Sequence, residues 1–304
     1  MPKILKIKLR NRSVKDNIAA YSFLSPAIIF YILFIGGPVI ATIVLSLFNY
    51  NLLNSPVFIG LQNFKALFSD PLTWQVIGNT MLLTGILVPI HVIIGLLLAA
   101  LISHERNRIF KYFYRTTIYF PSLLTTSSVA VAWFYMFNYD FGVFNWILNS
   151  LGLKGIPWLT SSKWVILAIS LFSMWKFVGT PFLYYLIGLQ NIPLGYYEAA
   201  RVDGANKVQT FFRITLPLLS PTLFFVIVIT IINTFQIFDE PYIITGGGPG
   251  NATRTLSLYI YEQSFKSYQM GFSSSIAFCL FLIVFIFTII QLIFQKKWVT
   301  YDYE

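Results

Sequence analysis

The sequence predicts an all-α membrane protein whose chain crosses the bilayer several times. Of its 304 residues, 57% are hydrophobic and only 11% are charged, whereas a soluble domain carries roughly 25% charged residues. The apolar residues are gathered in long intervals without charges, and about 20 such residues are enough for a helix to span the hydrocarbon core. These two observations together favour a polytopic, helical architecture.

Six intervals are long and apolar enough to be spans, and Lys176, in the fourth, is the one charge well inside a span. Several contain proline or glycine, which helices in lipid tolerate when neighbouring helices satisfy the freed backbone groups. The predicted spans are about 21–48, 79–102, 118–138, 164–188, 218–239 and 273–295. They form a transmembrane domain over 21–295, between a basic tail (1–20) and a short tail (296–304), with a polar connection over 190–217.

Lysine and arginine are unequally divided between the two sides of this domain. Both tails and the connections after the second and fourth spans share one side, and they hold fifteen of the 21 basic residues. The opposite side holds Lys65, Lys154, Lys163, Arg254 and Lys266. The positive-inside rule therefore places both termini in the cytoplasm. The net charge of +10 reflects this topology and does not indicate binding to nucleic acid. The first apolar stretch is longer than the core of a signal peptide, and we expect it to be retained.

The sequence offers no arrangement for catalysis or metal binding. Cys279 is the single cysteine, and neither His91 nor His104 has a second histidine or cysteine at ligand spacing. The glycine-rich run at 246–250 lacks the lysine of a phosphate-binding loop, so we expect no ATP site in this chain. The chain is accordingly predicted to be non-catalytic and to bind no cofactor.

The connection "NIPLGYYEAARVDGA" has helix signals, with Asn191 as a cap and Pro193 in the first turn. Gly204 is expected to end this helix. A second helix over about 206–215 would follow, and Ser220 with Pro221 would cap and open the fifth span. The segment has more apolar residues than a solvated loop needs: Ala199, Ala200, Val202, Ala205, Phe211, Phe212, Ile214 and Leu216. These residues fit either a knob that docks on another protein or an amphipathic connector at the membrane surface.

The same segment resembles the EAA signature of permease subunits in binding-protein-dependent ABC importers. That signature reads EAA, three residues, G, nine residues, I, one residue, LP. The matching residues are Glu198, Ala199, Ala200, Gly204, Ile214, Leu216 and Pro217, with Asp203, Ala205 and Phe211 matching the fuller sugar-permease form. The resemblance covers about 20–300. It includes "TGGGPGNATRTLSLYIYEQSF" (245–265), which is similar to the external loop of the carbohydrate-uptake subunit type represented by the larger maltose-importer permease.

The resemblance implies the type I ABC importer permease fold in a bacterial cytoplasmic membrane. It also implies that 190–217 is a coupling loop that sits in a cleft of an ATP-binding subunit. The implied partners are a second, homologous permease, two ATP-binding subunits that hold ATP and Mg, and an extracellular or periplasmic solute-binding protein. The implied activity is uptake of a sugar or oligosaccharide by alternating access.

Candidate residues for a solute pathway follow from the polar groups inside the predicted spans. Lys176 is either part of a pathway or a structural group that snorkels or pairs with Asp239 or Glu240. Asn233, Gln236 and Glu240 have helical spacing and would form one polar stripe, either for solute or for hydrogen bonds between helices.

The aromatic rings of Tyr184 and Tyr185 have two possible roles, because they could stack on sugar rings or serve packing alone.

Two other functions fit the sequence less well than an importer subunit does. A stand-alone carrier or channel would carry ionisable residues on several spans and an inverted repeat, neither of which is evident. A membrane anchor or scaffold would not need six spans. The cargo stays open, with mono-, di- and oligosaccharides, acidic glycans and glycerol phosphate all compatible with the resemblance.

Overall fold

A computed structural model of the chain describes residues 14–103, 105 and 107–300, with side chains from residue 17 onward. The chain is mostly helical (76%), and its only strands in the described part form a two-stranded antiparallel hairpin. The main elements before the bundle's centre are α1 (Val14–Tyr31), η1 (Ile32–Gly36), α2 (Gly37–Leu45), β1 (Phe48–Asn49), β2 (Val57–Phe58) and α3 (Gln62–Ser69). They are followed by α4 (Pro71–Ser103), α5 (Arg108–Leu123), α6 (Thr126–Met136), α7 (Val143–Ser150), α8 (Ser162–Phe177) and α9 (Gly179–Asn191).

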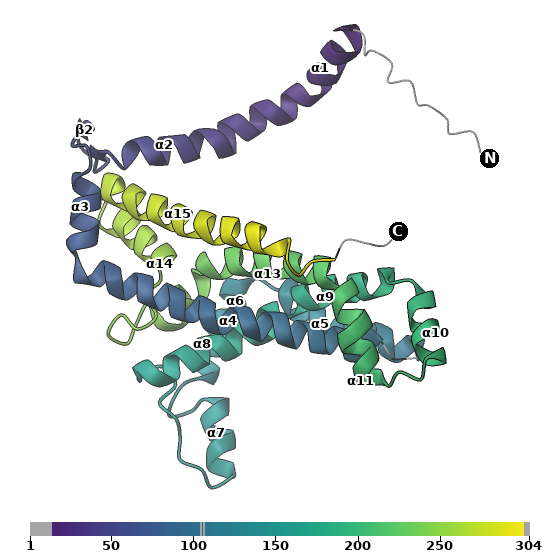
Figure 1. Cartoon of the computed structure of the whole chain (residues 1–304). Helices are drawn as coiled ribbons and strands as arrows, with labels where there is room; N and C mark the ends of the chain where they lie inside the picture. The colour runs from purple at the N-terminus through teal and green to yellow at the C-terminus, as the bar shows by residue number, and fades with distance from the viewer. Residues whose placement is uncertain (1–13, 104, 106, 301–304) are drawn as a thin grey trace.

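The second half continues with α10 (Leu194–Val202), α11 (Lys207–Thr210), η2 (Phe211–Thr215), α12 (Leu216–Leu218), α13 (Ser220–Phe235) and η3 (Pro241–Thr245). It closes with α14 (Leu256–Tyr261), η4 (Glu262–Lys266) and α15 (Met270–Gln295). The elements labelled η are single π-helical turns. Figure 1 shows the long helices running roughly side by side, with α3 and the β-hairpin at one end and α10 and α11 at the other.

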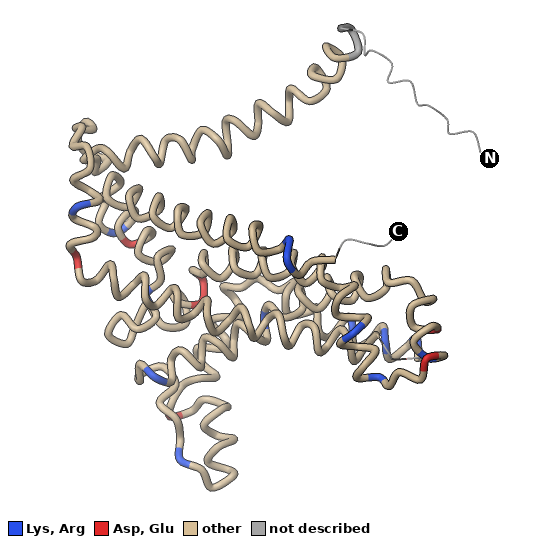
Figure 2. Tube along the Cα trace, in the orientation of Figure 1, with Lys and Arg blue, Asp and Glu red and all other residues tan. Residues whose placement is uncertain are grey.

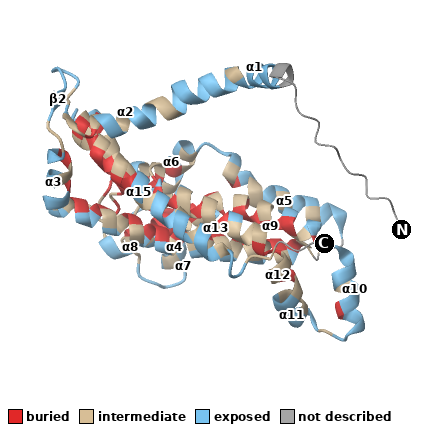
Figure 3. Cartoon of the chain, turned by 45° about the horizontal axis from the view of Figure 1, so that its top comes forward, coloured by how far each residue is buried: buried red, intermediate tan, exposed pale blue. Residues whose placement is uncertain are grey.

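The N-terminal arm is an apolar helical stretch, Asn17–Leu45, of which no residue in its most apolar window is buried. Only its α2 end packs against the bundle, along α15. Figure 1 shows α1 diverging from the other helices, and Figure 3 shows the arm exposed over most of its surface. The apolar side chains of this arm, Phe23 at 87% exposed among them, suit contact with lipid or with another membrane helix.

Helix α4 forms the centre of the bundle and packs against α8, α9 and α13. Its contact with α9 is close because Gly95 lies directly on Pro181. A Cβ atom at Gly95 would come within 2.8 Å of the Pro181 Cβ and 3.2 Å of the Phe182 amide nitrogen. Around this contact the buried core contains Ala99, Ile102, Phe182, Tyr185, Leu186, Leu219 and Val226.

Three helical stretches are by themselves long and apolar enough to cross a membrane: Asn17–Leu45, Pro71–Ser103 and Met270–Gln295. Two further pairs qualify if each counts as one bent span. The first pair, α8 with α9, bends by 43° around Val178, and the second, Lys207–Leu218 with Ser220–Phe235, bends by 67°. The predicted fourth span is thus bent, and the fifth begins at the bend around Leu219. The second and sixth begin earlier than predicted, at Pro71 and Met270.

The predicted third span, 118–138, is not one continuous helix. It is divided between α5 and α6, because Leu124 and the N-cap residue Thr125 have extended backbones. Pro121 lies in the last turn of α5, where it removes one helical N–H donor. The fifth span also ends before the predicted residue 239, because α13 stops at Phe235. There the carbonyl of Ile237 accepts a hydrogen bond from Thr255 Oγ1 at 2.9 Å, in place of a helical N–H.

Two elements hold the end of the bundle that carries the β-hairpin. The buried amide of Asn63 donates to the carbonyls of Ser46 (2.8 Å) and Phe48 (2.9 Å), which ties α3 to the chain leaving α2. Gly271 lies directly against the Phe48 carbonyl, with no room for a Cβ atom. Elsewhere, α6, α7 and α8 share an aromatic core around Phe137, Phe172 and Trp158.

The close contact between α4 and α9 gives a stability prediction. Gly95→Ala should destabilise the protein by about 1–3 kcal/mol, because the new methyl group overpacks against Pro181. Gly85→Ala on the same helix is the matched control, since its Cβ would have no neighbour within 4 Å. Thermal melting of the two variants in one detergent measures the difference. Equal melting temperatures would contradict the prediction, because they would show that α4 and α9 accommodate the added methyl group without loss of stability.

Candidate functional site: an interhelical cavity and a helical hairpin

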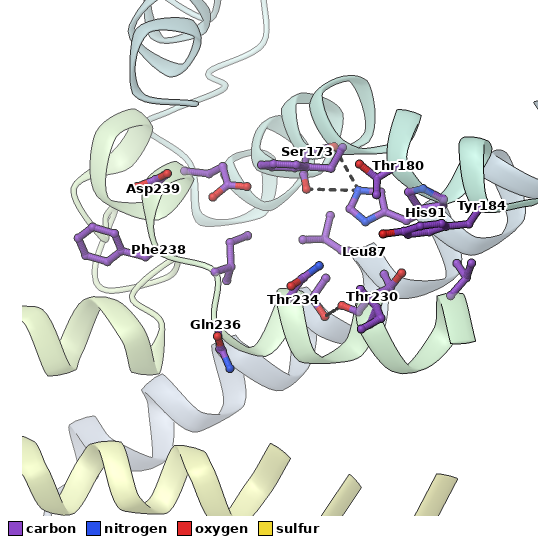
Figure 4. Close-up of a pocket in the computed structure, with 17 residues that line it drawn as sticks. Leu87, His91, Ser173, Thr180, Tyr184, Thr230, Thr234, Gln236, Phe238 and Asp239 are labelled. Atoms are coloured by element: carbon purple, nitrogen blue, oxygen red, sulfur yellow. Dashed lines mark hydrogen bonds between the residues drawn. The ribbon is translucent and has the colours of Figure 1, made fainter. Parts of the chain in front are cut away.

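A cavity of about 420 Å³ lies between α4, α8, α9, α13 and the unwound chain that follows α13. Its polar lining consists of His91, Ser173, Thr180, Tyr184, Thr230, Asn233, Thr234, Gln236, Asp239 and Glu240. Its apolar lining consists of Leu87, Phe177, Pro181, Val226, Ile229, Ile237 and Phe238. Figure 4 shows Tyr184, His91, Thr230 and Thr234 grouped around the space. An interior with hydroxyl, amide and carboxyl groups among apolar side chains is typical of a small-molecule site.

His91 is fixed on the wall that α4 contributes. Its Nε2 atom lies 3.1 Å from the Ser173 carbonyl oxygen and 3.4 Å from the Ser173 Oγ, as the dashed lines in Figure 4 mark. Its ring meets the ring of Phe177 edge-on, with centroids 6.4 Å apart. These contacts hold the imidazole between α4 and α8, and they leave it buried. Within the described residues there is no group of three His, Cys, Asp or Glu side chains that could hold a metal.

Carboxyl groups lie at the end of the cavity where α13 unwinds. Glu240 lines it and is only 4% exposed, yet it forms no salt bridge with any described residue. Asp239 precedes it in the lining, and Asn233 lies on α13. On α9, the ring of Tyr184 meets Phe225 edge-on, with centroids 5.1 Å apart. The cavity thus offers hydrogen-bonding groups from both α9 and α13.

The structure brings together four of the predicted pathway residues, since Tyr184, Asn233, Gln236 and Glu240 all line the cavity. The reason given for three of them was wrong, because they do not form a stripe on one helix. Only Asn233 lies within α13, while Gln236 is its C-cap and Glu240 precedes the next turn. Figure 4 shows the Gln236 side chain directed away from the labelled cavity residues. Tyr185 is fully buried behind the wall, not in the lining.

Lys176 lies outside the lining and is 1% exposed. Its Nζ atom donates to the carbonyl oxygens of Pro121 and Leu124, both at 2.8 Å. It forms no salt bridge with Asp239 or Glu240. The structure therefore places this lysine at the break between α5 and α6.

The sequence reasoning missed the cavity residues His91, Ser173, Thr180, Thr230 and Thr234. A signal was present for two of them, because Thr230 lies three positions before Asn233 and four before Thr234, which is helical spacing on α13. His91 has no partner at ligand spacing in the sequence, and its polar neighbour in the structure, Ser173, comes from another helix, α8. Nothing in the sequence pairs those two segments.

The second candidate site is the hairpin formed by α10, α11 and η2. Helix α10 ends as predicted at Gly204, whose φ is +74°. The Ala205 N–H donates to the Ala200 carbonyl (2.9 Å) and the Gly204 N–H to that of Arg201 (3.2 Å). This pair of bonds is the Schellman motif, which needs a left-handed residue at the glycine position.

The predicted helix starts around this hairpin need correction. Asn191 is the last residue of α9 and caps nothing, because Ile192 and Pro193 are extended and α10 starts at Leu194. Asn206 is instead the cap of α11, through a reciprocal pair of bonds with Gln209. Ser220 is the first residue of α13, not its cap, and its Oγ donates to the Pro217 carbonyl while it accepts the Thr300 N–H.

The hairpin exposes apolar side chains, among charged ones, that have no partner in the monomer. Val202 (87%), Val208 (65%) and Phe212 (61%) are exposed. Of the residues that carry the EAA resemblance, Glu198, Ala199, Asp203 and Gly204 are exposed, Ala200 is buried, and Ala205, Phe211, Ile214, Leu216 and Pro217 are half-buried. The Thr215 hydroxyl lies 3.3 Å from the Tyr197 hydroxyl and joins the two arms. The hairpin is therefore a small, internally braced unit that exposes both apolar and charged side chains.

A bundle of apolar helices with an interior cavity and a protruding hairpin is typical of a membrane transport subunit. Residues 91–300 match the family model described as the binding-protein-dependent transport system inner membrane component. The chain belongs to this family of ABC transporter permeases.

Its relatives support the same family over nearly the whole length. The chain is 39% identical to the probable ABC transporter permease protein YesP of Bacillus subtilis, over 96% of each chain. It is 38% identical to the sulfoquinovosyl glycerol transport system permease protein SmoG of Agrobacterium fabrum, over 91% of this chain and 90% of that one. It is 34% identical to the trehalose/maltose transport system permease protein MalF of Thermococcus litoralis, over 95% and 96%.

Among solved structures, the fold is similar to that of a chain of a bacterial ABC transporter involved in the import of the acidic polysaccharide alginate. The TM-score is 0.80 at 23% identity, over 93% of this chain and 97% of that chain. A second structure of a bacterial alginate ABC transporter, in complex with an alginate pentasaccharide-bound periplasmic protein, gives a TM-score of 0.81 at 22% identity. These matches show that the chain has the fold of ABC importer permeases.

The cavity gives a prediction on water access. In a Cys279→Ala background, Asn233→Cys should react with a small, water-soluble thiol reagent, because thiolates form only where water reaches the sulfur. Phe285→Cys on α15, exposed in the monomer at 51%, is the control and should stay unlabelled where lipid covers it. Labelling in proteoliposomes followed by mass spectrometry measures both. An unreactive Asn233→Cys in every state of the transport cycle would show that the cavity is dry.

Proposed function

We propose that this chain is a transmembrane permease subunit of an ATP-driven ABC importer and forms, with a second homologous permease, the pathway for a sugar or oligosaccharide. The observation that carries the proposal is the polar cavity enclosed by apolar helices in a chain of this family. Relatives whose names specify trehalose and maltose or sulfoquinovosyl glycerol support a carbohydrate cargo. Import would proceed by alternating access.

In this proposal the chain crosses the bacterial cytoplasmic membrane six times, with both termini in the cytoplasm. In addition to the three long helices, α5 with α6 would provide the third crossing, the bent pair α8 with α9 the fourth, and α13 the fifth. The distribution of charge supports the orientation. Figure 2 shows basic residues gathered at the end of the bundle that carries α10 and α11, and positive charge favours the cytoplasmic side.

The hairpin would be the coupling element that receives force from an ATP-binding subunit. Glu198, Ala199, Asp203 and Gly204 would lie at the contact, together with the exposed Val202. The half-buried Ala205, Phe211, Ile214, Leu216 and Pro217, with the buried Ala200, would join the hairpin to α13, which lines the cavity. The chain itself would bind no cofactor, since ATP and Mg would be held by two ATP-binding subunits. A solute-binding protein would deliver the cargo from outside.

Within the membrane, Tyr184, Asn233 and Glu240 would contact the solute from facing walls of the cavity. Sugars present hydroxyl groups and apolar ring faces, and the cavity offers both polar groups and an aromatic ring to match them. Lys176 would support the wall from behind.

Reconstitution tests the proposal directly. The chain is purified with its second permease and two ATP-binding subunits and placed in proteoliposomes. ATP hydrolysis should rise when a sugar-loaded binding protein is added, and labelled sugar should accumulate only with ATP. Uptake by this chain alone, driven by an ion gradient, would identify a stand-alone carrier and contradict the proposal.

The conformation of Gly204 gives a specific prediction on coupling. Gly204→Pro should abolish the rise in ATP hydrolysis on addition of loaded binding protein, because proline cannot adopt a φ of +74° and cannot donate the N–H bond to Arg201. Gly152→Pro is the matched control. Gly152 also has a positive φ, +73°, and its N–H also donates to a helix-end carbonyl, that of Asn149.

Gly152 follows α7, far from the hairpin along the chain, so its variant should keep the stimulation in assembled complexes. Size-exclusion chromatography shows whether each complex is assembled. Unchanged stimulation in assembled Gly204→Pro complexes would show that the hairpin does not couple the two subunits.

A further inference from the structure

Two interruptions of the helical bundle lie side by side. Helix α5 ends at Leu123 and α6 begins at Thr126, with an extended backbone between them. Helices α8 and α9 meet at a 43° bend around Val178. The segments α5 and α9 pack against each other, as do α5 and α8. The bend and the break therefore face each other across one helix interface.

Three hydrogen bonds cross this interface in both directions. The Lys176 ammonium donates to the carbonyls of Pro121 and Leu124, both at 2.8 Å, and the Ser122 hydroxyl donates back to the Lys176 carbonyl at 2.9 Å. The helices also touch at Gly179. A Cβ atom there would lie 2.7 Å from both the Ile118 carbonyl oxygen and the Ser122 Oγ.

This contact stabilises the charged ammonium group of Lys176. Two of its three donors go to carbonyls at the end of α5, where the helix dipole favours a cation. The ammonium also lies 5.2 Å from the centre of the Phe177 ring, a cation–π distance. No described carboxylate forms a salt bridge with it. A lysine that is 1% exposed and satisfied by backbone groups of another helix is placed to fasten that helix.

We propose that Lys176 is a positioning residue, which fastens the α5–α6 break to the α8–α9 bend so that both broken helices move as one unit. The residues next to it are part of the cavity wall, since Phe177 and Thr180 line the cavity. The fastened unit is therefore the support of that wall. Movement of α9 during a transport cycle carries α5 and α6 with it.

The first test measures rigidity and does not depend on the proposed transport function. Spin labels are placed at Val131 on α6 and Ile187 on α9, both exposed, in a Cys279→Ala background of the assembled protein. With Lys176 present, the distance distribution between the labels should be narrow. Lys176→Met should broaden it, because the carbonyls of Pro121 and Leu124 lose their donor.

Lys176→Arg should restore the narrow distribution, since a guanidinium can also donate to two carbonyls. Lys163→Met, an exposed lysine on the same helix, is the matched control and should change nothing. A distribution in Lys176→Met that equals the original would overturn the proposal. Should that variant fail to assemble, Ser122→Ala removes a single bond of the three and should give a smaller broadening. No broadening in Ser122→Ala would then count against the proposal.

The second test rests on the proposed function, because it measures coupling. The ratio of ATP hydrolysis with and without loaded binding protein should fall about fivefold or more in Lys176→Met, with basal hydrolysis unchanged and with recovery in Lys176→Arg. Gly179→Ala should lower the ratio in the same way by pushing α9 off α5. A normal ratio in Lys176→Met overturns the proposal. If the unmodified complex shows no stimulation, the proposed function fails, and the spin-label result still decides the role of Lys176.

Discussion

The structure depends on one constraint, which is that a backbone group inside a membrane must find a partner within the protein. A straight helix satisfies this constraint by itself, but this chain interrupts several of its apolar helices. Each interruption that bears on the cavity has its own donor from another segment. The Lys176 ammonium serves the carbonyls at the end of α5, and the Thr255 hydroxyl serves the Ile237 carbonyl after α13.

The cavity is a consequence of these interruptions. Because α13 stops at Phe235, the chain from Gln236 to Glu240 bends away from the helix axis and lines a space that a continuous helix would fill. Because α9 leaves α8 at an angle, Thr180 and Tyr184 face the same space as α13 does. The close contact of Gly95 with Pro181 then sets how closely α4 approaches α9. The site is thus built where regular structure is broken, and its partners make the breaks stable.

The hairpin of α10 and α11 differs from the cavity, because contacts between residues close in the sequence determine its conformation. Gly204 has a positive φ at the end of α10. The two hydrogen bonds of that helix end and those of the Asn206 cap join residues within six positions of each other. A short pattern in the sequence therefore identified this element and its glycine turn correctly. The errors there, at Asn191 and Ser220, concerned which residue begins a helix. Asn191 precedes an extended backbone, and Ser220 follows a bent one. The packing of the neighbouring segments decides both conformations.

The sequence by itself determined the helical membrane class, most of the apolar segments, the hairpin and the family, because these follow from composition, local turn chemistry and a spaced motif. It also indicated Tyr184, Asn233, Gln236 and Glu240, although the helical stripe invoked for the last three does not exist. Only the tertiary structure decided where the spans break, that His91 meets Ser173, and that Lys176 faces Pro121 rather than a carboxylate. Those pairs are separated by 82 and 55 positions, and no local pattern encodes which helices become neighbours. Helix packing decides it, since a buried lysine binds whichever acceptor the neighbouring helix brings within reach.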